Sequence, residues 1–343
     1  YVLGAGFSKA VANLPVMKEM VSTFTDIREQ QRKLGHRNRV LWGDQLLSYL
    51  DYLEAEFFRK PCVDTENGQS YESCNFKENL EALVSFIDLN LSGDIRATLV
   101  DTNGRKIDFT KRSLFWNYND LDELRRCVQT YLYLALIGPT PDSPLLRLFV
   151  DQLVHGDTLV TFNYDLVVET ALYKQALWNP SDGYGIEFRS LPQVSDSRKF
   201  RTLIPLYKLH GSLNWGRSEL RFFYDDQSPI FPGYLKDEQP PLAVQCQGKH
   251  EGNWVMPSFI KEFTTPGLLS VWTKAFDAVR RAEEVVVIGY SLPEADSAAC
   301  LLLGTIGVSG KPLTIVDPQT EILEARYKLV TQSTRILTYT ELK

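Results

Sequence analysis

The chain has 343 residues, of which 44% are hydrophobic and 23% are charged, enough for a large core in one domain or in a domain with an insertion. The net charge of −6 argues against direct nucleic-acid binding. The sequence contains no apolar run of about 18 residues, so it predicts no transmembrane helix. The five cysteines include no CxxC pair, so we expect free thiols in the cytoplasm and no zinc site.

The opening segment Val2–Ala10, VLGAGFSKA, predicts a short strand followed by a tight turn. Because the chain starts at Tyr1, inside this predicted strand and without a Met, we expect further residues upstream. Gly4 and Gly6 permit positive φ, which allows backbone N–H groups to face an anion. The turn lacks the additional glycine or lysine of the known phosphate loops, so a nucleotide site and a purely structural turn both fit.

A helical region follows the opening turn. Apolar residues recur at three- and four-residue spacing in Leu41–Phe58 and Asn79–Leu91. The segment Gly138–Pro144 is typical of a break. We therefore expect one domain over residues 1–343 with a helical insertion or lid at approximately 20–150.

Short apolar segments that end in polar residues predict further strands: Asp157–Asp165, Leu203–Trp215, Glu283–Asp296, Lys311–Gln319 and Thr334–Tyr339. Between the second and third of them, residues 218–257 predict an insertion of loops and short strands. Nearly all-apolar strands alternating with helices are typical of an α/β, Rossmann-like parallel sheet covered by helices on both faces. In such sheets ligands bind beyond the carboxyl ends of the strands, so the polar clusters at these ends should meet in one crevice.

Three motifs in this chain order resemble the sirtuin family: Gly4-Ala5-Gly6, the Thr161–Asp165 segment TFNYD, and His210-Gly211. The segment IGYSLPEAD after residue 287 is similar to the later sirtuin segment that contacts the adenosine side of NAD. The resemblance covers residues 1–15, 157–215 and 283–340 and implies NAD binding. The contacts it implies are Gly4, Ala5, Gly6, Phe7, Ser8, Asp165, Gly211, Gly289, Ser291 and Asp317.

The departures from the sirtuin pattern narrow the activity that the resemblance implies. The zinc cysteines are missing, Asn13–Met20 replaces the usual segment after the opening turn, and Phe162 stands where sirtuins have Gln. These changes are similar to those in bacterial antiphage sirtuin-like proteins, which hydrolyse NAD. The resemblance thus implies an NAD hydrolase, with a protein deacylase and a non-catalytic NAD or ADP-ribose sensor as alternatives.

Asn163 and His210 are the expected catalytic residues. His210 titrates near neutrality and is suited to act as the base, on water or through a ribose hydroxyl. Asn163 is suited to orient the water or to hold a ribose hydroxyl, and Ser8 to bond a phosphate or the nicotinamide ribose. Ser291 and Asp317 are candidates for the adenosine end; no basic residue is obvious beside Asp317, which favours NAD over NADP.

Structural interpretations compete at several of these positions. Asn163 is also suited to cap a helix, and Asp165 is better explained by the start of the helix near Leu166. Asp296 is explained as an acid at a helix N-terminus, and Asp317 before Pro318 fits a turn as well as a ligand contact. By analogy with the family, we expect a homo-oligomer controlled by a separate partner, for example a hexameric DNA-translocating ATPase.

Overall fold

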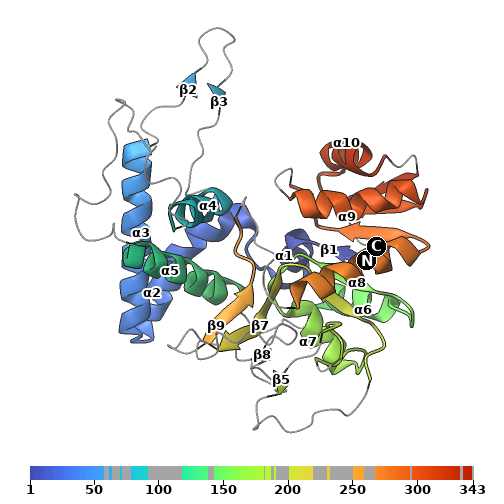
Figure 1. Ribbon diagram of the computed structural model, residues 1–343, viewed down its shortest axis with the longest axis horizontal. Coiled ribbons are helices and arrows are strands. Elements are labelled where there is room, and N and C mark those ends of the chain that lie inside the picture. Colours follow the sequence, from blue (N-terminus) through green and yellow to red (C-terminus); the bar gives the residue numbers. More distant parts are fainter. Residues whose placement is uncertain are drawn as a thin grey trace. The chain divides into compact units, whose positions relative to one another are not determined.

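The computed structural model describes residues 1–57, 62–63, 70–71, 79–91, 118–137, 143–180, 182–186, 189–190, 201–218, 230–231, 250–258, 267–293, 296–332 and 335–341. The chain forms two compact units (Figure 1). The first unit comprises Tyr1–Leu14, Leu136–Val255 and Glu262–Lys343, and the second comprises Pro15–Ala135 and Met256–Lys261.

A six-stranded sheet forms the centre of the first unit, in the order β12-β11-β10-β1-β4-β6. All neighbouring strands are parallel. The strands are β1 (Val2–Leu3), β4 (Leu159–Thr161), β6 (Leu206–Lys208), β10 (Val285–Ile288), β11 (Leu313–Val316) and β12 (Ile336–Tyr339). The α/β, Rossmann-like prediction is confirmed.

The chain winds through this sheet in two directions. From β1 it moves outward to β4 and β6, and then crosses to β10 on the other side of β1 before it continues to β11 and β12. Right-handed crossovers in opposite directions place the connecting helices on opposite faces of the sheet. The strand order reverses between β1 and β10, and ligands of doubly wound sheets bind at such a switch point.

Among the described residues, six helices pack on this sheet: α1 (Ala5–Ala12), α6 (Pro144–Gln152), α7 (Val167–Lys174), α8 (Leu268–Arg281), α9 (Ser297–Val308) and α10 (Thr320–Thr331). Their buried apolar side chains form one core with the strands. Every residue of β1, β4 and β11 is buried, as expected for strands covered on both faces.

A second sheet of four strands also lies in the first unit, in the order β5-β8-β7-β9. The strands are β5 (Arg189–Ser190), β7 (Gly211–Ser218), β8 (Ile230–Phe231) and β9 (His250–Trp254). The segment Leu203–Trp215 contains the predicted strand, β6, and the polar turn after it, but its last residues form a further strand, β7, that was not predicted. Its residues belong to β6 and β7 in different sheets, because the chain turns at Gly211, whose φ is +81°.

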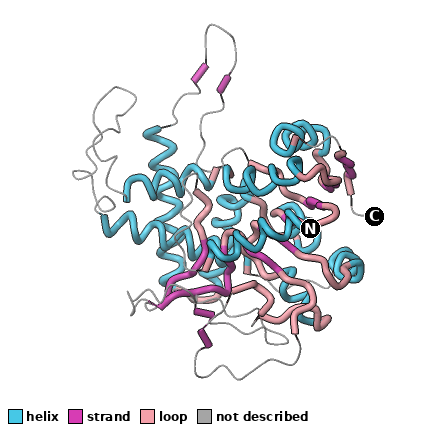
Figure 2. Tube along the Cα trace, turned by 45° about the vertical axis from the view of Figure 1, so that its right-hand side comes forward, coloured by secondary structure: helices cyan, strands magenta, loops and turns pink. Residues whose placement is uncertain are grey.

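Helices make up most of the described regular structure of the second unit (Figure 2). They are the 3-10 turn η1 (Met17–Glu19), α2 (Met20–Lys33), α3 (Arg37–Phe57), α4 (Leu80–Leu91) and α5 (Tyr118–Leu136), with the short strands β2 (Cys62–Val63) and β3 (Ser70–Tyr71). Tyr131 is buried among them; its ring meets Phe24 edge-on, and its hydroxyl donates to the Arg39 carbonyl at 2.8 Å. The helical patterns at Leu41–Phe58 and Asn79–Leu91 correspond to α3 and α4.

The predicted boundaries of the two insertions, approximately 20–150 and 218–257, remain predictions. Residues 92–117, 219–229 and 232–249 lie outside the described part, as do residues 138–142 of the predicted break. In the part that the structure does describe, none of the helices is both long enough and apolar enough to cross a membrane.

Candidate functional site

The carboxyl ends of β1 and β10 meet at the switch point through their backbones. The Gly4 N–H donates to the Ile288 carbonyl at 3.0 Å, and the Gly6 N–H donates to the Gly289 carbonyl at 2.8 Å. We expected the amides of Gly4 and Gly6 to be able to face a bound anion. The structure corrects this, because both amides donate hydrogen bonds to the end of β10. Ala5, the first residue of α1, is exposed at the helix N-terminus.

The glycines at this point are required by the close approach of the two turns. A Cβ atom on Gly4 would lie 2.4 Å from the Gly289 oxygen, and one on Gly289 would lie 2.2 Å from the Phe7 nitrogen. Gly289 also has a φ of +62°, which favours glycine. The structural interpretation of the opening turn accounts for these contacts, and a nucleotide at the helix N-terminus remains a prediction.

Asn163 connects the end of β4 to the opening turn. Its Nδ2 donates to the Gly4 carbonyl at 2.8 Å and to the Ser8 hydroxyl at 3.0 Å, and its backbone N–H donates to Thr161 Oγ1 at 3.1 Å. The Thr161 hydroxyl in turn donates to the Leu3 carbonyl at 2.9 Å. The side chain of Asn163 accepts no hydrogen bond from the described residues, so its Oδ1 is the atom available to a ligand or a water.

Asp165, rather than Asn163, starts the next helix. The Asp165 Oδ1 accepts from the Val167 N–H at 3.1 Å, and Asp165 is buried. The alternative of Asn163 as a helix cap is thus wrong, and the structural interpretation of Asp165 is correct. The residue fixes the chain between β4 and α7, and its contact with a nucleotide remains a prediction.

His210 follows β6, the neighbour of β4 in the sheet, and is buried. Its ring meets the Phe162 ring edge-on, with centroids 5.3 Å apart. Its Nε2 lies 3.5 Å from Oδ2 of Asp296. Gly211 makes the turn out of this position into β7. The two expected catalytic residues therefore follow adjacent strands of the same sheet.

Asp296 is a site residue whose partner the sequence did not indicate. As expected, it caps a helix: its Oδ1 accepts from the Ala299 N–H at 3.3 Å at the start of α9. Its Oδ2 accepts from the Tyr290 hydroxyl at 3.1 Å, and the same oxygen faces His210. Burial, reinforced by this carboxylate, raises the pKa of Tyr290 well above its usual value, so Tyr290 remains a donor at neutral pH.

The residues expected at the adenosine end follow β10 and β11. Ser291 is exposed, and its carbonyl accepts from Nη1 of Arg326 at 2.8 Å. Asp317 Oδ1 accepts from the Gln319 N–H at 2.8 Å, which confirms its role in a turn without testing a ligand contact. Arg326, on α10, is a basic residue near this end that sequence spacing did not indicate.

A buried ion pair lies directly behind the segment that carries Asn163. Lys208 Nζ lies 2.5 Å from Oε1 of Glu169, with both side chains only 1% exposed. The same ammonium donates to the carbonyls of Tyr164, at 3.3 Å, and Asp165. The helical position of Glu169 in α7 gave no signal of this pairing, because the two residues meet only in the folded sheet.

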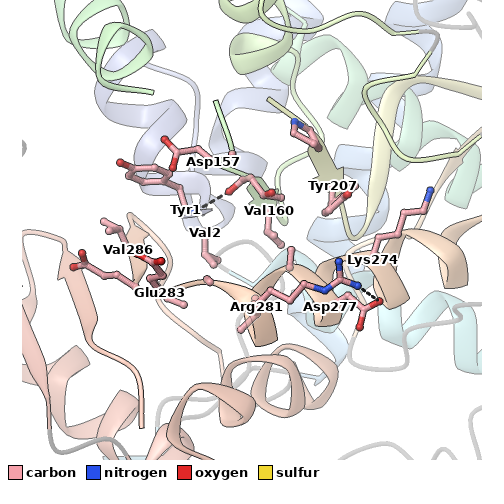
Figure 3. A pocket seen from close by; sticks show the side chains of 18 of the residues that line it. Tyr1, Val2, Asp157, Val160, Tyr207, Lys274, Asp277, Arg281, Glu283 and Val286 are labelled. Carbon is pink, nitrogen blue, oxygen red and sulfur yellow. Dashed lines mark hydrogen bonds and ion pairs between the residues drawn. The ribbon is translucent and has the colours of Figure 1, made fainter. Parts of the chain in front are cut away.

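A cavity of about 1060 Å³ opens at the opposite end of the sheet (Figure 3). It is lined by residues at the amino ends of the strands, among them Tyr1, Thr158, Pro205 and Glu284. None of the expected site residues lines it. The candidate site therefore rests on the strand ends at the switch point and not on this cavity.

No family model and no curated protein matches the chain. Solved structures similar to it include a Sir2 homologue mutant in complex with 2'-O-acetyl ADP ribose, at 13% identity and a TM-score of 0.33, covering 73% of this chain and 90% of that one. A Sir2 homologue mutant in complex with ADP ribose has 14% identity and a TM-score of 0.31, covering 70% and 88%. A structure described as the basis for the mechanism and regulation of Sir2 enzymes has 13% identity and a TM-score of 0.28, covering 96% and 90%. Similarity at this level carries no argument about function, so the assignment of the fold rests on the strand order.

Proposed function

We propose that this chain is an NAD glycohydrolase, which cleaves the bond between nicotinamide and ribose to give nicotinamide and ADP-ribose. One observation carries the proposal: Asn163 is bonded to the opening turn at the switch point, while the buried His210 follows the adjacent strand. The order of the sirtuin-like motifs supports NAD as the ligand of such a crevice.

The chemistry needs few groups. When the bond between ribose C1′ and the nicotinamide nitrogen breaks, its electron pair neutralises the pyridinium, so no general acid is required. The ribose gains oxocarbenium character, and a water attacks C1′. His210 takes a proton from this water, directly or through a ribose hydroxyl, and releases it to solvent afterwards.

The remaining residues bind and orient the substrate. Oδ1 of Asn163 accepts from the attacking water or from a ribose hydroxyl. The exposed N-terminus of α1, at Ala5, presents the positive end of the helix dipole to the phosphates, with Ser8 close behind it. Asp165 and Gly211 act through the loops whose conformation they fix, and Ser291 and Asp317 face the adenosine.

The biological role is proposed on the sirtuin-like motifs alone. Cleavage in the cytoplasm would deplete NAD during phage infection. A homo-oligomer under the control of a separate partner, such as a hexameric DNA-translocating ATPase, would keep the activity restrained until then.

The test is release of nicotinamide from NAD by the purified chain, followed by chromatography. We expect His210→Ala and Asn163→Ala to lower the rate by about a hundredfold or more. His155→Ala is the matched control, because His155 is exposed beside the remote cavity and should leave the rate unchanged. Release that survives both site substitutions would overturn the assignment. Binding of ADP-ribose without release would favour the sensor, and release only with an acyl-lysine peptide would favour the deacylase.

A further inference from the structure

Three groups converge on the carboxylate of Asp296. This residue comes from the second half of the doubly wound sheet, between β10 and α9, whereas His210 comes from the first half, after β6. Asp296 is 2% exposed, so the carboxylate is held away from water. A buried carboxylate is unfavourable unless hydrogen bonds or a positive charge compensate it.

Capping a helix uses only one oxygen of this carboxylate. Oδ1 accepts from the Ala299 N–H and completes the first turn of α9. Oδ2 takes no part in the cap; it accepts from the Tyr290 hydroxyl at 3.1 Å and lies 3.5 Å from Nε2 of His210. The Tyr290 ring is itself fixed by stacking on Phe162, with centroids 4.2 Å apart.

Aromatic rings and a carboxylate surround His210. The titratable groups that face it include Asp296, Tyr290 through Asp296, and Tyr164, whose ring centroid is 6.1 Å away. Lys208, two residues earlier, is engaged by Glu169 of α7. Phe162 adds apolar surface beside the ring and itself contacts Trp272, whose indole donates to the Leu209 carbonyl at 2.9 Å.

We propose that Asp296 is a positioning residue for His210: its Oδ2 orients the imidazole through Nε2 and stabilises the imidazolium formed when His210 takes the proton. The inference rests on the proposed function, in which His210 is the base. The proton balance is unchanged, because an O–H bond of water or ribose breaks, an N–H bond forms on His210, and Asp296 stays ionised. Tyr290 keeps Oδ2 directed at the ring.

The test compares Asp296→Asn with the unmodified chain. Asparagine caps helices as well as aspartate, so α9 keeps its first turn while the charge beside His210 is removed. We expect the pKa of His210 to fall by about one or more, because an opposite charge at this distance favours the protonated ring. The readout is NMR of the full chain with labelled histidine, in which only four histidines contribute and His210→Ala identifies the signal. In the unmodified chain the neutral ring should carry its proton on Nε2.

Activity gives the second readout. In Asp296→Asn the rate of nicotinamide release should fall about tenfold or more in kcat, with little change in KM. The acid limb of the pH profile should move to lower pH, because the base stays unprotonated to lower pH. Ser143→Ala is the matched control: it removes the side-chain cap of α6, lowers the Tm, and should leave the His210 titration and the pH profile unchanged.

The two proposals fail in distinguishable ways. An unaltered titration and tautomer of His210 in Asp296→Asn would show that Asp296 is only a cap, whether or not the chain releases nicotinamide. Absence of release by the unmodified chain, with the His210 titration shifted as expected, would count against hydrolysis by the isolated chain and leave the His210–Asp296 coupling standing. If Asp296→Asn does not fold, Tyr290→Phe carries the test. Loss of the Tyr290 hydroxyl leaves more of the negative charge of Asp296 to interact with the imidazolium, so the pKa of His210 should rise. An unchanged pKa of His210 would overturn the proposal.

Discussion

Asn163 uses its amide nitrogen to hold the opening turn, through Gly4 and Ser8, and keeps its amide oxygen for other partners. Asparagine is therefore required both for its amide donor and for its amide acceptor. Aspartate would replace the donor by an acceptor, and alanine would remove both functions. A side chain that is both part of the scaffold and part of the site must be studied with a folding measurement beside every activity measurement.

Asp317 offers a test of substrate choice at a single residue. Its carboxylate should repel a 2′-phosphate, so the chain should prefer NAD to NADP. Asp317→Asn keeps the acceptor for the Gln319 N–H and removes the charge. We expect the ratio of kcat/KM for NADP to that for NAD to rise about tenfold, as Arg326 stands near this end.

Both kcat/KM values are measured by nicotinamide release. Lys328→Met, a substitution on the solvent side of the same helix α10, should leave the ratio unchanged. An unchanged ratio in Asp317→Asn would show that Asp317 belongs to the turn alone.

The sequence was sufficient to place most candidate residues, because polar residues after short apolar strands are local features. Gly4, Asn163, His210 and Gly289 all lie at strand ends as predicted. The pairing of His210 with Asp296 was not predictable, because it depends on which strands are neighbours. The engaged amides of Gly4 and Gly6 were missed for the same reason: their acceptors follow β10 in the sequence.

At the scale of elements, the Lys208–Glu169 pair joins β6 to α7 behind the Asn163 segment. Removing one partner leaves an uncompensated buried charge, so Lys208→Met should lower the free energy of unfolding by about 3–5 kcal/mol. The double substitution Lys208→Met/Glu169→Leu should be less destabilising than the single one. Urea unfolding gives both values.

The exposed pair Lys328–Glu324 is the control for this experiment, since its side chains are 55% and 35% exposed. Lys328→Met should change the free energy of unfolding by at most about 0.5 kcal/mol. Equal effects of Lys208→Met and Lys328→Met would contradict the importance of the buried pair.

The Lys208–Glu169 pair also predicts how the free energy of unfolding depends on pH. Burial raises the pKa of Glu169 above 4.5, against the opposing effect of Lys208. In the unfolded chain the pKa returns to its usual value, so between the two pKa values the folded state binds the extra proton. This contribution to stability is present in full below pH 4.5 and is lost as the pH rises through the folded-state pKa.

We therefore expect the free energy of unfolding of the unmodified chain, relative to Glu169→Gln, to decrease as the pH rises above 4.5. Urea titrations at a series of pH values measure this difference. A difference that increases over this range would mean that the ion pair outweighs the effect of burial.

At the scale of the whole sheet, its two halves meet backbone to backbone at Gly4, Gly6 and Gly289. Gly289→Ala should lower the free energy of unfolding by more than about 3 kcal/mol or prevent folding, because the new Cβ would lie 2.2 Å from the Phe7 nitrogen. The measurement is again urea unfolding, with the yield of folded protein as a first indication.

Gly310→Ala is a close control, since Gly310 has the same φ of +62° and a methyl group there would meet nothing within 4 Å among the described residues. Gly310→Ala should lower the free energy of unfolding by only about 1–2 kcal/mol, which is the cost of the left-handed conformation for alanine. Similar losses at Gly289 and Gly310 would show that the close approach at the switch point is not limiting.

The fold class could be predicted from alternating strands and helices, but the order of the strands could not. Short apolar strands such as Val2–Leu3 carry no information on their neighbours. Short strands of the second sheet were predicted within residues 218–257, but β7 was missed because Leu203–Trp215 is apolar on both sides of the turn at Gly211.

The contact of glycine with glycine also limits how this sequence can vary over evolutionary time. Enlarging Gly4 or Gly6 is blocked by Gly289, and enlarging Gly289 is blocked by the turn that contains Gly6 and Phe7. A single replacement at any of the three glycines would place a Cβ atom 2.2 to 2.9 Å from the facing backbone, so each is expected to be destabilising. We therefore expect changes in function to arise at side chains such as Ser8, Asn163 and Asp317 rather than at the three glycines.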